Sequence, residues 1–254
     1  MSKTKVLFAG EAIYLLRTVY KGWDSISLGG YAEHGGHFIK ALEDNNIDYD
    51  YCPTNRVAED FPWTLEEMKR YDVIAISDVG SNTFLITKRT MEGEKTPNRL
   101  KLIKQYVADG GGFLMWGGYL SFTGYHAKGY YKGTPIEDIL PVSLLDMGDN
   151  VEVPEGFLPK ILDEDHPILQ GIPKKWQGWF LSYNRLIPKE GANVIASIEE
   201  YNNDPFLTVW EYGNGRSLAS AVDCAYHGAA PSFLNWEYTS TLYGNMVKWL
   251  AKDI

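Results

Sequence analysis

Residues that can carry protons come directly after short apolar runs of the sequence. Glu11 ends the run "KVLFAGE", Asp78 follows "VIAIS", and Asp223 and His227 follow "RSLASAV". Continuous apolar runs of this length are typical of buried parallel strands. The carboxyl ends of parallel strands lie at one edge of a sheet, where open α/β proteins bind ligands. We therefore expect these side chains to converge on one site.

Two kinds of chemistry would suit such a cluster. Glu11 and Asp78 could act as acid and base, because neighbouring carboxylates push their pKa values apart. Alternatively, each of them simply caps the helix or loop that follows. Together with Asp223 and His227 they also form a mixed oxygen and nitrogen set of the kind that binds divalent metals. No closely spaced histidine pair supports a metal, so we predict no metal site and no cofactor.

Cysteine and the remaining histidines offer weaker candidates. Cys224 beside His227 suggests a thiolate nucleophile, although a lone cysteine after an apolar strand is more often a small buried residue. His34 and His37 could face a ligand from a helix start, or they could lie on an exposed helical face.

The strands that would position these residues alternate with helices. Three helices are predicted between the strands, and their ranges begin at Tyr31, Thr64 and Pro97. Residues 31–46 have apolar residues at helical spacing, and residues 97–110 carry helix start and stop signals. The helix that starts at Thr64 has a capping box, which Glu67 completes. The strand "FLMW" then ends at Gly117, Gly118 and Tyr119. Four strand–helix steps predict a parallel sheet with helices on both faces.

The second half is less regular. Residues 125–190 are rich in loops, and strands are expected in "ANVIASIEEY", "PFLTVWEYG" and "RSLASAVDCAYHG", with a hairpin turn at 213–215. Apolar residues at helical spacing predict a C-terminal helix that packs on the sheet. No linker divides the chain, so we expect a single domain over 1–254.

Composition narrows the function. The 254 residues carry a formal charge of −9 with scattered Lys and Arg, which argues against nucleic acid as a partner. No segment is apolar enough to span a membrane, no signal sequence is recognisable, and two cysteines fit a reducing cytoplasm. Aromatic residues make up 14% of the chain, which favours a ligand cleft or a homo-oligomeric contact, with partly exposed packing as the alternative.

In this arrangement the chain resembles the class I glutamine amidotransferase-like superfamily, in a branch of bacterial cytoplasmic proteins related to the trehalose-utilisation family. The resemblance rests on "KVLFAGE", "YDVIAISDVGSNT", "DGGGFLMWGGYLSF", "DEDHPILQGIP" and "SAVDCAYHG" followed by Trp236, in this order along nearly the whole chain. It implies a flavodoxin-like three-layer α/β sandwich with a mostly parallel sheet and antiparallel additions in the C-terminal half.

The resemblance also implies a nucleophile elbow after "FLMW". Glutaminases of this superfamily hold a cysteine there, activated by a His-x-Glu pair near the C-terminus. This chain has Gly117 at the elbow, and His227 is followed at the carboxylate position by Ala229. We therefore expect no glutamine hydrolysis by the usual route.

A ligand site is still expected at the elbow. Gly117 and Gly118 would leave the backbone open, with free N–H groups at a helix start. Gly80, Ser81 and Asn82 would supply polar contacts, and Tyr119, Trp236 and Trp116 would supply stacking surface, unless these aromatics are core residues, which is the better expectation for Trp116. Three hypotheses follow: a protein that binds a small polar metabolite such as a sugar, an enzyme that uses Glu11, Asp78 and His227 as acid, base or metal ligands, or an assembly subunit.

Overall fold

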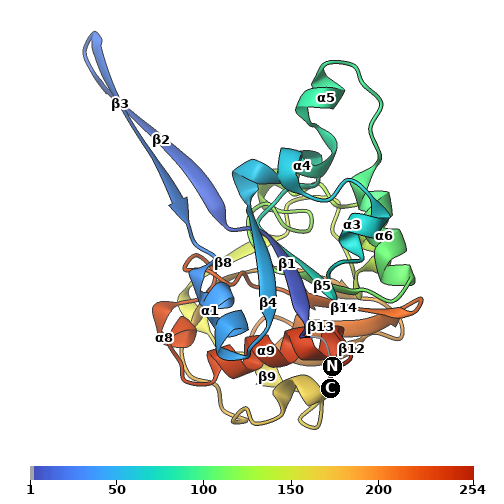
Figure 1. Ribbon diagram of the computed structural model, residues 1–254. Coiled ribbons are helices and arrows are strands. Elements are labelled where there is room, and N and C mark those ends of the chain that lie inside the picture. The colour runs from blue at the N-terminus through green and yellow to red at the C-terminus, as the bar shows by residue number, and fades with distance from the viewer. Residues whose placement is uncertain (1–2) are drawn as a thin grey trace.

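A mixed eight-stranded sheet forms the centre of the computed structural model, which describes residues 3–254 (Figure 1). The strand order is β4-β1-β5-β6-β14-β13-β12-β9. Five neighbouring strands are parallel: β4 (Asp48–Pro53), β1 (Lys5–Gly10), β5 (Val73–Ser77), β6 (Gly112–Met115) and β14 (Gly215–Ser220). Three more continue the sheet in antiparallel fashion: β13 (Asp204–Tyr212), β12 (Asn193–Ile198) and β9 (Lys160–Ile161).

The parallel strands form as expected from their apolar runs. Every residue of β5 and β6 is buried, as is all of β1 after Lys5. In chain order the parallel strands are arranged 2-1-3-4-5, which is the flavodoxin-like order. The order reverses between β1 and β5, and the strand ends at this point begin the site described below.

Helices cover the sheet on both sides. On one side α1 (Gly36–Asp44) packs against α9 (Thr239–Leu250), which lies on β6 and β14; on the other, α6 (Arg99–Ala108) packs against α3 (Leu65–Met68) and α7 (Pro135–Ile139) (Figure 1). The capping box at Thr64 is present, with both of its hydrogen bonds. Shorter helices lie at the loops: η1 (Thr54–Arg56), α2 (Val57–Asp60), α4 (Ser81–Leu85), α5 (Lys88–Met91), η2 (Tyr125–Ala127), η3 (Pro167–Leu169) and α8 (Pro231–Leu234).

The C-terminal half adds antiparallel structure, as predicted. The β13–β14 hairpin turns at Gly213, whose φ of 59° suits glycine. The loop-rich segment contains two small sheets, one of β8 (Asn150–Phe157) with β10 (Phe180–Asn184) and one of β7 (Val142–Ser143) with β11 (Ile187–Pro188). The first of these brings its residues to the carboxyl ends of the parallel strands.

A long β-hairpin is the feature that the sequence analysis missed. β2 (Ala12–Lys21) and β3 (Asp24–Glu33) pair along their whole length and project away from the rest of the protein (Figure 1). We call residues 12–33 the arm. Because the arm includes residues 31–33, the helix expected over 31–46 begins only at Gly36. Among residues 3–254, no helix is long and apolar enough to cross a membrane.

Candidate active site at the carboxyl ends of the strands

The ends of β1 and β5 bring two carboxylates together. Gly10 lies so close to β5 that a Cβ atom there would be 1.7 Å from the Ser77 carbonyl oxygen. This close approach places Glu11 beside Ser77, whose hydroxyl donates a hydrogen bond of 2.5 Å to Glu11 Oε1. Asp78 follows at the end of the neighbouring strand. The predicted convergence of Glu11 and Asp78 is therefore present.

Both carboxylate residues have an unusual backbone conformation. Glu11 has a φ of 52° and Asp78 a φ of 50°, in the left-handed region that residues with a Cβ rarely adopt. Such conformations cost about 1–3 kcal/mol each and cluster at functional sites. The turn after each strand thus directs the carboxylate at the expense of backbone strain.

Burial changes the protonation of both groups. Desolvation raises the pKa of Glu11 well above its ordinary value, and the charges of Asp223 and Asp78 raise it further, while the Ser77 hydrogen bond lowers it. Desolvation also raises the pKa of Asp78. The Leu120 N–H, which donates to Asp78 Oδ1 at 2.6 Å, lowers this pKa but does not cancel the rise. Two acidic groups with raised pKa values therefore share one edge of the sheet.

His227 lies at the more open side of this cluster. Its Nδ1 is 3.5 Å from Asp223 Oδ2, and its Nε2 is 3.7 Å from Glu152 Oε1. The contact with Asp223 is the main cause that raises the pKa of His227 above 6.5. The Tyr119 ring lies 4.1 Å from the imidazole, and its hydroxyl donates to Glu152 at 3.0 Å. His227 is therefore held between two carboxylates and an aromatic ring.

Glu152 was not among the predicted residues. It comes from β8 in the loop-rich segment, and nothing in the local sequence pattern distinguishes it from other surface glutamates. Ala229, two residues after His227, is fully buried. His227 therefore contacts two other carboxylates: that of Asp223, four residues earlier in the chain, and that of Glu152, which lies in a different sheet.

The glycine pair after β6 serves close packing, and the expectation of an open backbone there is wrong. A Cβ at Gly117 would be 2.5 Å from the Ala221 carbonyl oxygen, and one at Gly118 would be 2.8 Å from Asp78 Oδ1. Their N–H groups are also engaged: Gly117 donates to the Val222 carbonyl and Gly118 to Asn184 Oδ1. Turns, and no helix, follow the pair.

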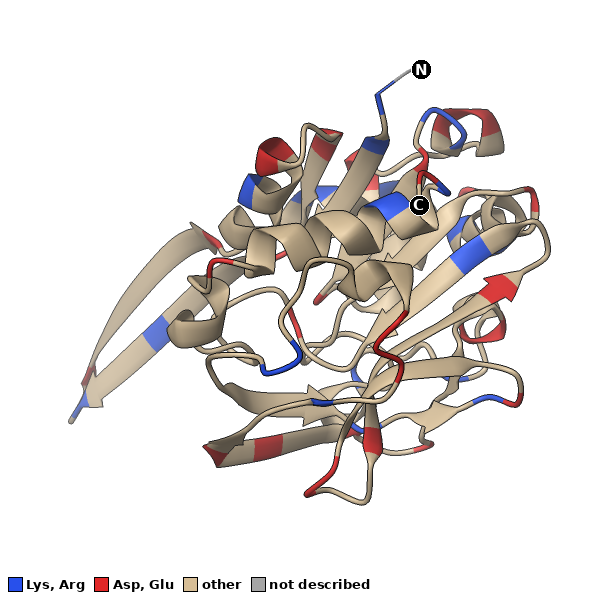
Figure 2. Ribbon diagram, turned by 90° about the horizontal axis from the view of Figure 1, so that it is seen from below, with Lys and Arg blue, Asp and Glu red and all other residues tan. Residues whose placement is uncertain are grey.

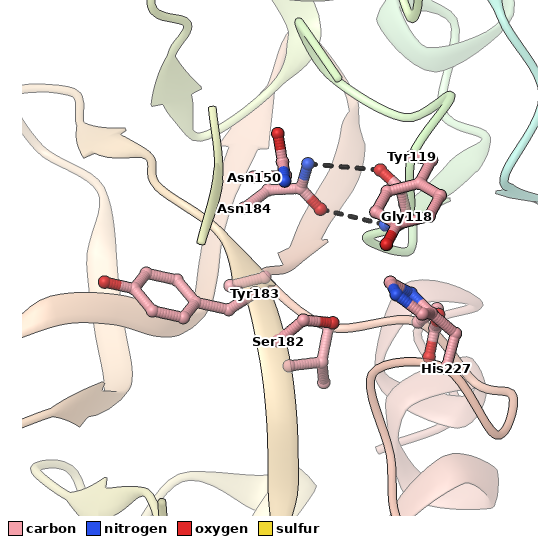
Figure 3. Close-up of a pocket in the computed structure, with 10 residues that line it drawn as sticks. Gly118, Tyr119, Asn150, Ser182, Tyr183, Asn184 and His227 are labelled. Atoms are coloured by element: carbon pink, nitrogen blue, oxygen red, sulfur yellow. Dashed lines mark hydrogen bonds and ion pairs between the residues drawn. The ribbon is translucent and has the colours of Figure 1, made fainter. Parts of the chain in front are cut away.

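Asn184 and Asp149 hold the loop that begins at this pair. The Asn184 amide accepts from Gly118 N–H and donates to the Gly118 carbonyl (Figure 3). It also donates to Asp149 Oδ1. Asp149, which is buried, also accepts from the backbone N–H groups of Thr123 and Gly124. The pocket beside Asn184, Ser182 and His227 measures about 10 Å³, room for one water molecule. The pocket is therefore too small for anything larger than water, while Tyr119 and His227 are exposed beside it.

The loop after β5 packs against the chain more than it opens to solvent. Ser81 donates from its backbone to the Gly129 carbonyl and from its hydroxyl to the Tyr130 carbonyl. A Cβ at Gly80 would be 3.1 Å from the Lys128 carbonyl. Asn82 is exposed on α4. Of these three predicted ligand contacts, only Asn82 presents its side chain to solvent.

Cys224, Trp116 and Trp236 are core residues. The Cys224 thiol is buried near Ser77, and burial raises its pKa, which does not favour a thiolate. Trp116 packs against Phe38 and Tyr243, and Trp236 packs against Trp176 in the same buried core. The stacking surface expected from Trp236 is therefore absent from the strand ends.

The structure also shows where the candidate histidines His34 and His37 lie and whether a metal site is present. His34 donates from its backbone to the Glu11 carbonyl at 2.7 Å, so the arm returns to the site where it begins. His37 lies 3.1 Å from the Tyr226 hydroxyl on the outside of α1. Within residues 3–254, no three His, Cys, Asp or Glu side chains are arranged to hold a metal ion, so the geometry does not support the metal form of the enzyme hypothesis.

Comparison with known proteins agrees with this architecture. A cytoplasmic protein from Salmonella typhimurium is 39% identical, with a TM-score of 0.92 over 96% of this chain and 98% of that one. A second cytoplasmic protein, from strain LT2, is 41% identical over 97% and 99%, also with a TM-score of 0.92. A ThuA-like protein from Parabacteroides merdae shares the fold at 13% identity, with a TM-score of 0.60 over 99% and 91%.

The search of curated proteins gives no match. The sequence model of one family, described as "Putative glutamine amidotransferase", matches residues 5–252. The chain therefore belongs to this family of glutamine amidotransferase-like proteins.

Proposed function

We propose that the protein binds a small polar metabolite at the carboxyl ends of the strands, without the thiol chemistry of a glutaminase. The observation that carries the proposal is the group formed by Tyr119, His227 and Glu152 beside the buried Glu11 and the half-buried Asp78. Tyr119 and His227 each expose more than a third of their side chain. They offer a ring face and polar atoms next to groups that can exchange protons.

A carbohydrate or a similar polyhydroxy compound suits this surface best. The face of Tyr119 can pack against the C–H side of a sugar ring, while His227 and Glu152 can bond its hydroxyls. The formal charge of −9 disfavours polyanions such as nucleic acid. A cytoplasmic location is part of the proposal, supported by the two Salmonella proteins described as cytoplasmic.

Thermal unfolding in the presence of a panel of sugars, sugar acids and polyols tests the proposal. A ligand that binds the native state raises the melting temperature by mass action. Tyr119→Ala should lower the affinity about tenfold or more, since it removes the exposed ring, whereas Tyr130→Ala changes a more exposed tyrosine outside the cluster and should leave the affinity unchanged. Affinity that is unaffected by Tyr119→Ala would place the ligand elsewhere.

The same site argues against glutamine hydrolysis through a thiol. Cys52 and Cys224 are the only cysteines, both are buried, and burial raises the pKa of each. Glycine at position 117 cannot form an acyl-enzyme. We expect no release of ammonia from glutamine. Ammonia release that His227→Ala abolishes would contradict this expectation.

A second candidate, an acid–base enzyme, is favoured by the raised pKa values of Glu11 and Asp78. Acidic groups whose pKa is raised hold a proton that they can donate to a leaving or carbonyl oxygen, and a neighbouring imidazole can accept one. Glu11→Gln keeps the acceptor for Ser77 but cannot supply a proton. If the protein is an enzyme, this variant should keep ligand affinity and lose turnover by about 100-fold or more. Unchanged turnover would exclude Glu11 as the acid.

A further inference from the structure

The arm, residues 12–33, exposes apolar side chains that no part of the described chain covers. Its paired strands put alternate residues on opposite faces. One face, which we call the aliphatic face, carries Ile13, Leu15, Val19, Ile26 and Leu28 together with the charged residues Arg17, Lys21 and Asp24, and the other carries three tyrosines and Leu16 among serines, a threonine and Glu33. Trp23, at the tip, is fully exposed. Single exposed apolar residues are ordinary, but this many exposed apolar side chains on one projecting hairpin mark a binding surface.

The arm touches the rest of the chain only near its base. The Ala12 N–H donates to Thr54 Oγ1, and the hydroxyls of Tyr14 and Tyr31 meet the Asn55 side chain at 3.3 Å. Beyond these contacts the two strands project freely (Figure 1). An isolated two-stranded hairpin is marginally stable in water, so strands this long need a partner to cover a face.

We propose that the partner is a second copy of this chain, and that the aliphatic faces of two arms pack against each other. The charges of the arm cancel: Arg17 and Lys21 balance Asp24 and Glu33, so the charge of −9 belongs to the remainder of the chain (Figure 2). The arm therefore has no excess of either charge that would favour a strongly basic or a strongly anionic partner. Another neutral, apolar arm matches it.

The size of the arm also fits a copy of itself. Each strand has 10 residues, so the two strands together reach the lower end of the about 20–30 residues that a stable interface takes from each partner, and the aliphatic face alone supplies about half of that number. Contact between arms is self-complementary, as a two-fold dimer requires, because the same surface serves on both sides. Since the arm projects from the body, pairing through it also keeps the two acidic bodies apart.

Measurement of native mass by sedimentation or light scattering on the full chain tests the proposal. We expect twice the chain mass of 28.7 kDa at micromolar concentration. Leu15→Glu places a charge in the aliphatic face and should weaken association roughly 100-fold, giving single chains. Met91→Glu changes an exposed apolar residue on α5, outside the arm, and should remain dimeric.

Leu28→Ser is a milder second variant of the same face and should also weaken the dimer. Both substituted residues are exposed in the single chain, so circular dichroism should show an unchanged fold. A monomeric wild-type protein, or a dimer that is indifferent to Leu15→Glu, would overturn the proposal. Co-sedimentation of the wild-type monomer with phosphatidylcholine vesicles, lost in Leu15→Glu, would overturn it in favour of a lipid surface.

Discussion

At the scale of single residues, Glu11 makes the strongest prediction because its pKa is raised. The folded protein holds the Glu11 proton more tightly than the unfolded chain does, so its contribution to stability is complete below pH 4.5 and is lost as the pH rises through the raised pKa. Glu11→Gln has no proton to lose. The free energy of unfolding of this variant should therefore increase relative to wild type as the pH rises from 4.5 toward the raised pKa of Glu11.

Urea unfolding at several pH values measures this difference. Glu92→Gln, which changes an exposed carboxylate on the surface, serves as the control, and its difference from wild type should stay nearly constant. A difference for Glu11→Gln that does not change with pH would show that Glu11 is ionised as readily in the folded protein as in the unfolded chain.

Gly118 provides a second prediction at this scale. Its φ is 131°, and an added Cβ would be 2.8 Å from Asp78 Oδ1. Gly118→Ala should lower the free energy of unfolding by about 2–4 kcal/mol and displace Asp78. Gly36→Ala is the matched control, because its Cβ would meet nothing within 4 Å; it should change stability by about 1 kcal/mol or less. If the two substitutions changed the free energy of unfolding equally, the turn after β6 would have room for an added Cβ atom.

At the scale of elements, the loop after β6 depends on β10. Asn184→Ala removes three hydrogen bonds, to both backbone groups of Gly118 and to buried Asp149. We expect a loss of about 2–3 kcal/mol in the free energy of unfolding and faster hydrogen exchange in residues 118–124. Asn150→Ala alters a side chain that lines the same pocket but makes no hydrogen bond to this loop, and should leave its exchange unchanged. Similar exchange in both variants would refute the role of Asn184.

The elements also show where sequence reasoning succeeds. Buried parallel strands can be recognised in a sequence as apolar runs. The carboxylates at their ends, Glu11, Asp78 and Asp223, could therefore be found from the sequence. Asn184 and Glu152 could not, because β8 and β10 lie in a loop-rich segment and reach the site only through tertiary contacts. The arm could not be predicted because both of its faces carry apolar residues. The sequence therefore lacks the alternation of apolar and polar residues that identifies a half-buried strand.

At the scale of the whole molecule, the alternation of strands and helices predicts a parallel sheet, the resemblance to the superfamily implies its flavodoxin-like strand order, and this order determines which strand ends meet. The glycine pair illustrates the limit of that inference. Its place after β6 could be predicted, but whether the space beside it was empty depended on Ala221 and Asp78, which come from other strands. Topology therefore predicts which residues lie near one another, and side-chain packing decides what room is left.

The distribution of charge makes the last prediction. The formal charge of −9 lies outside the neutral arm, so two bodies joined by their arms repel each other. Salt screens this repulsion, since the Debye length falls from about 30 Å at 0.01 M to about 8 Å at 0.15 M ionic strength. The dimer dissociation constant should therefore decrease about tenfold or less between these conditions, as sedimentation can measure. An increase would indicate that ion pairs, rather than the apolar faces of the arms, hold the two chains together, because salt weakens attraction between opposite charges.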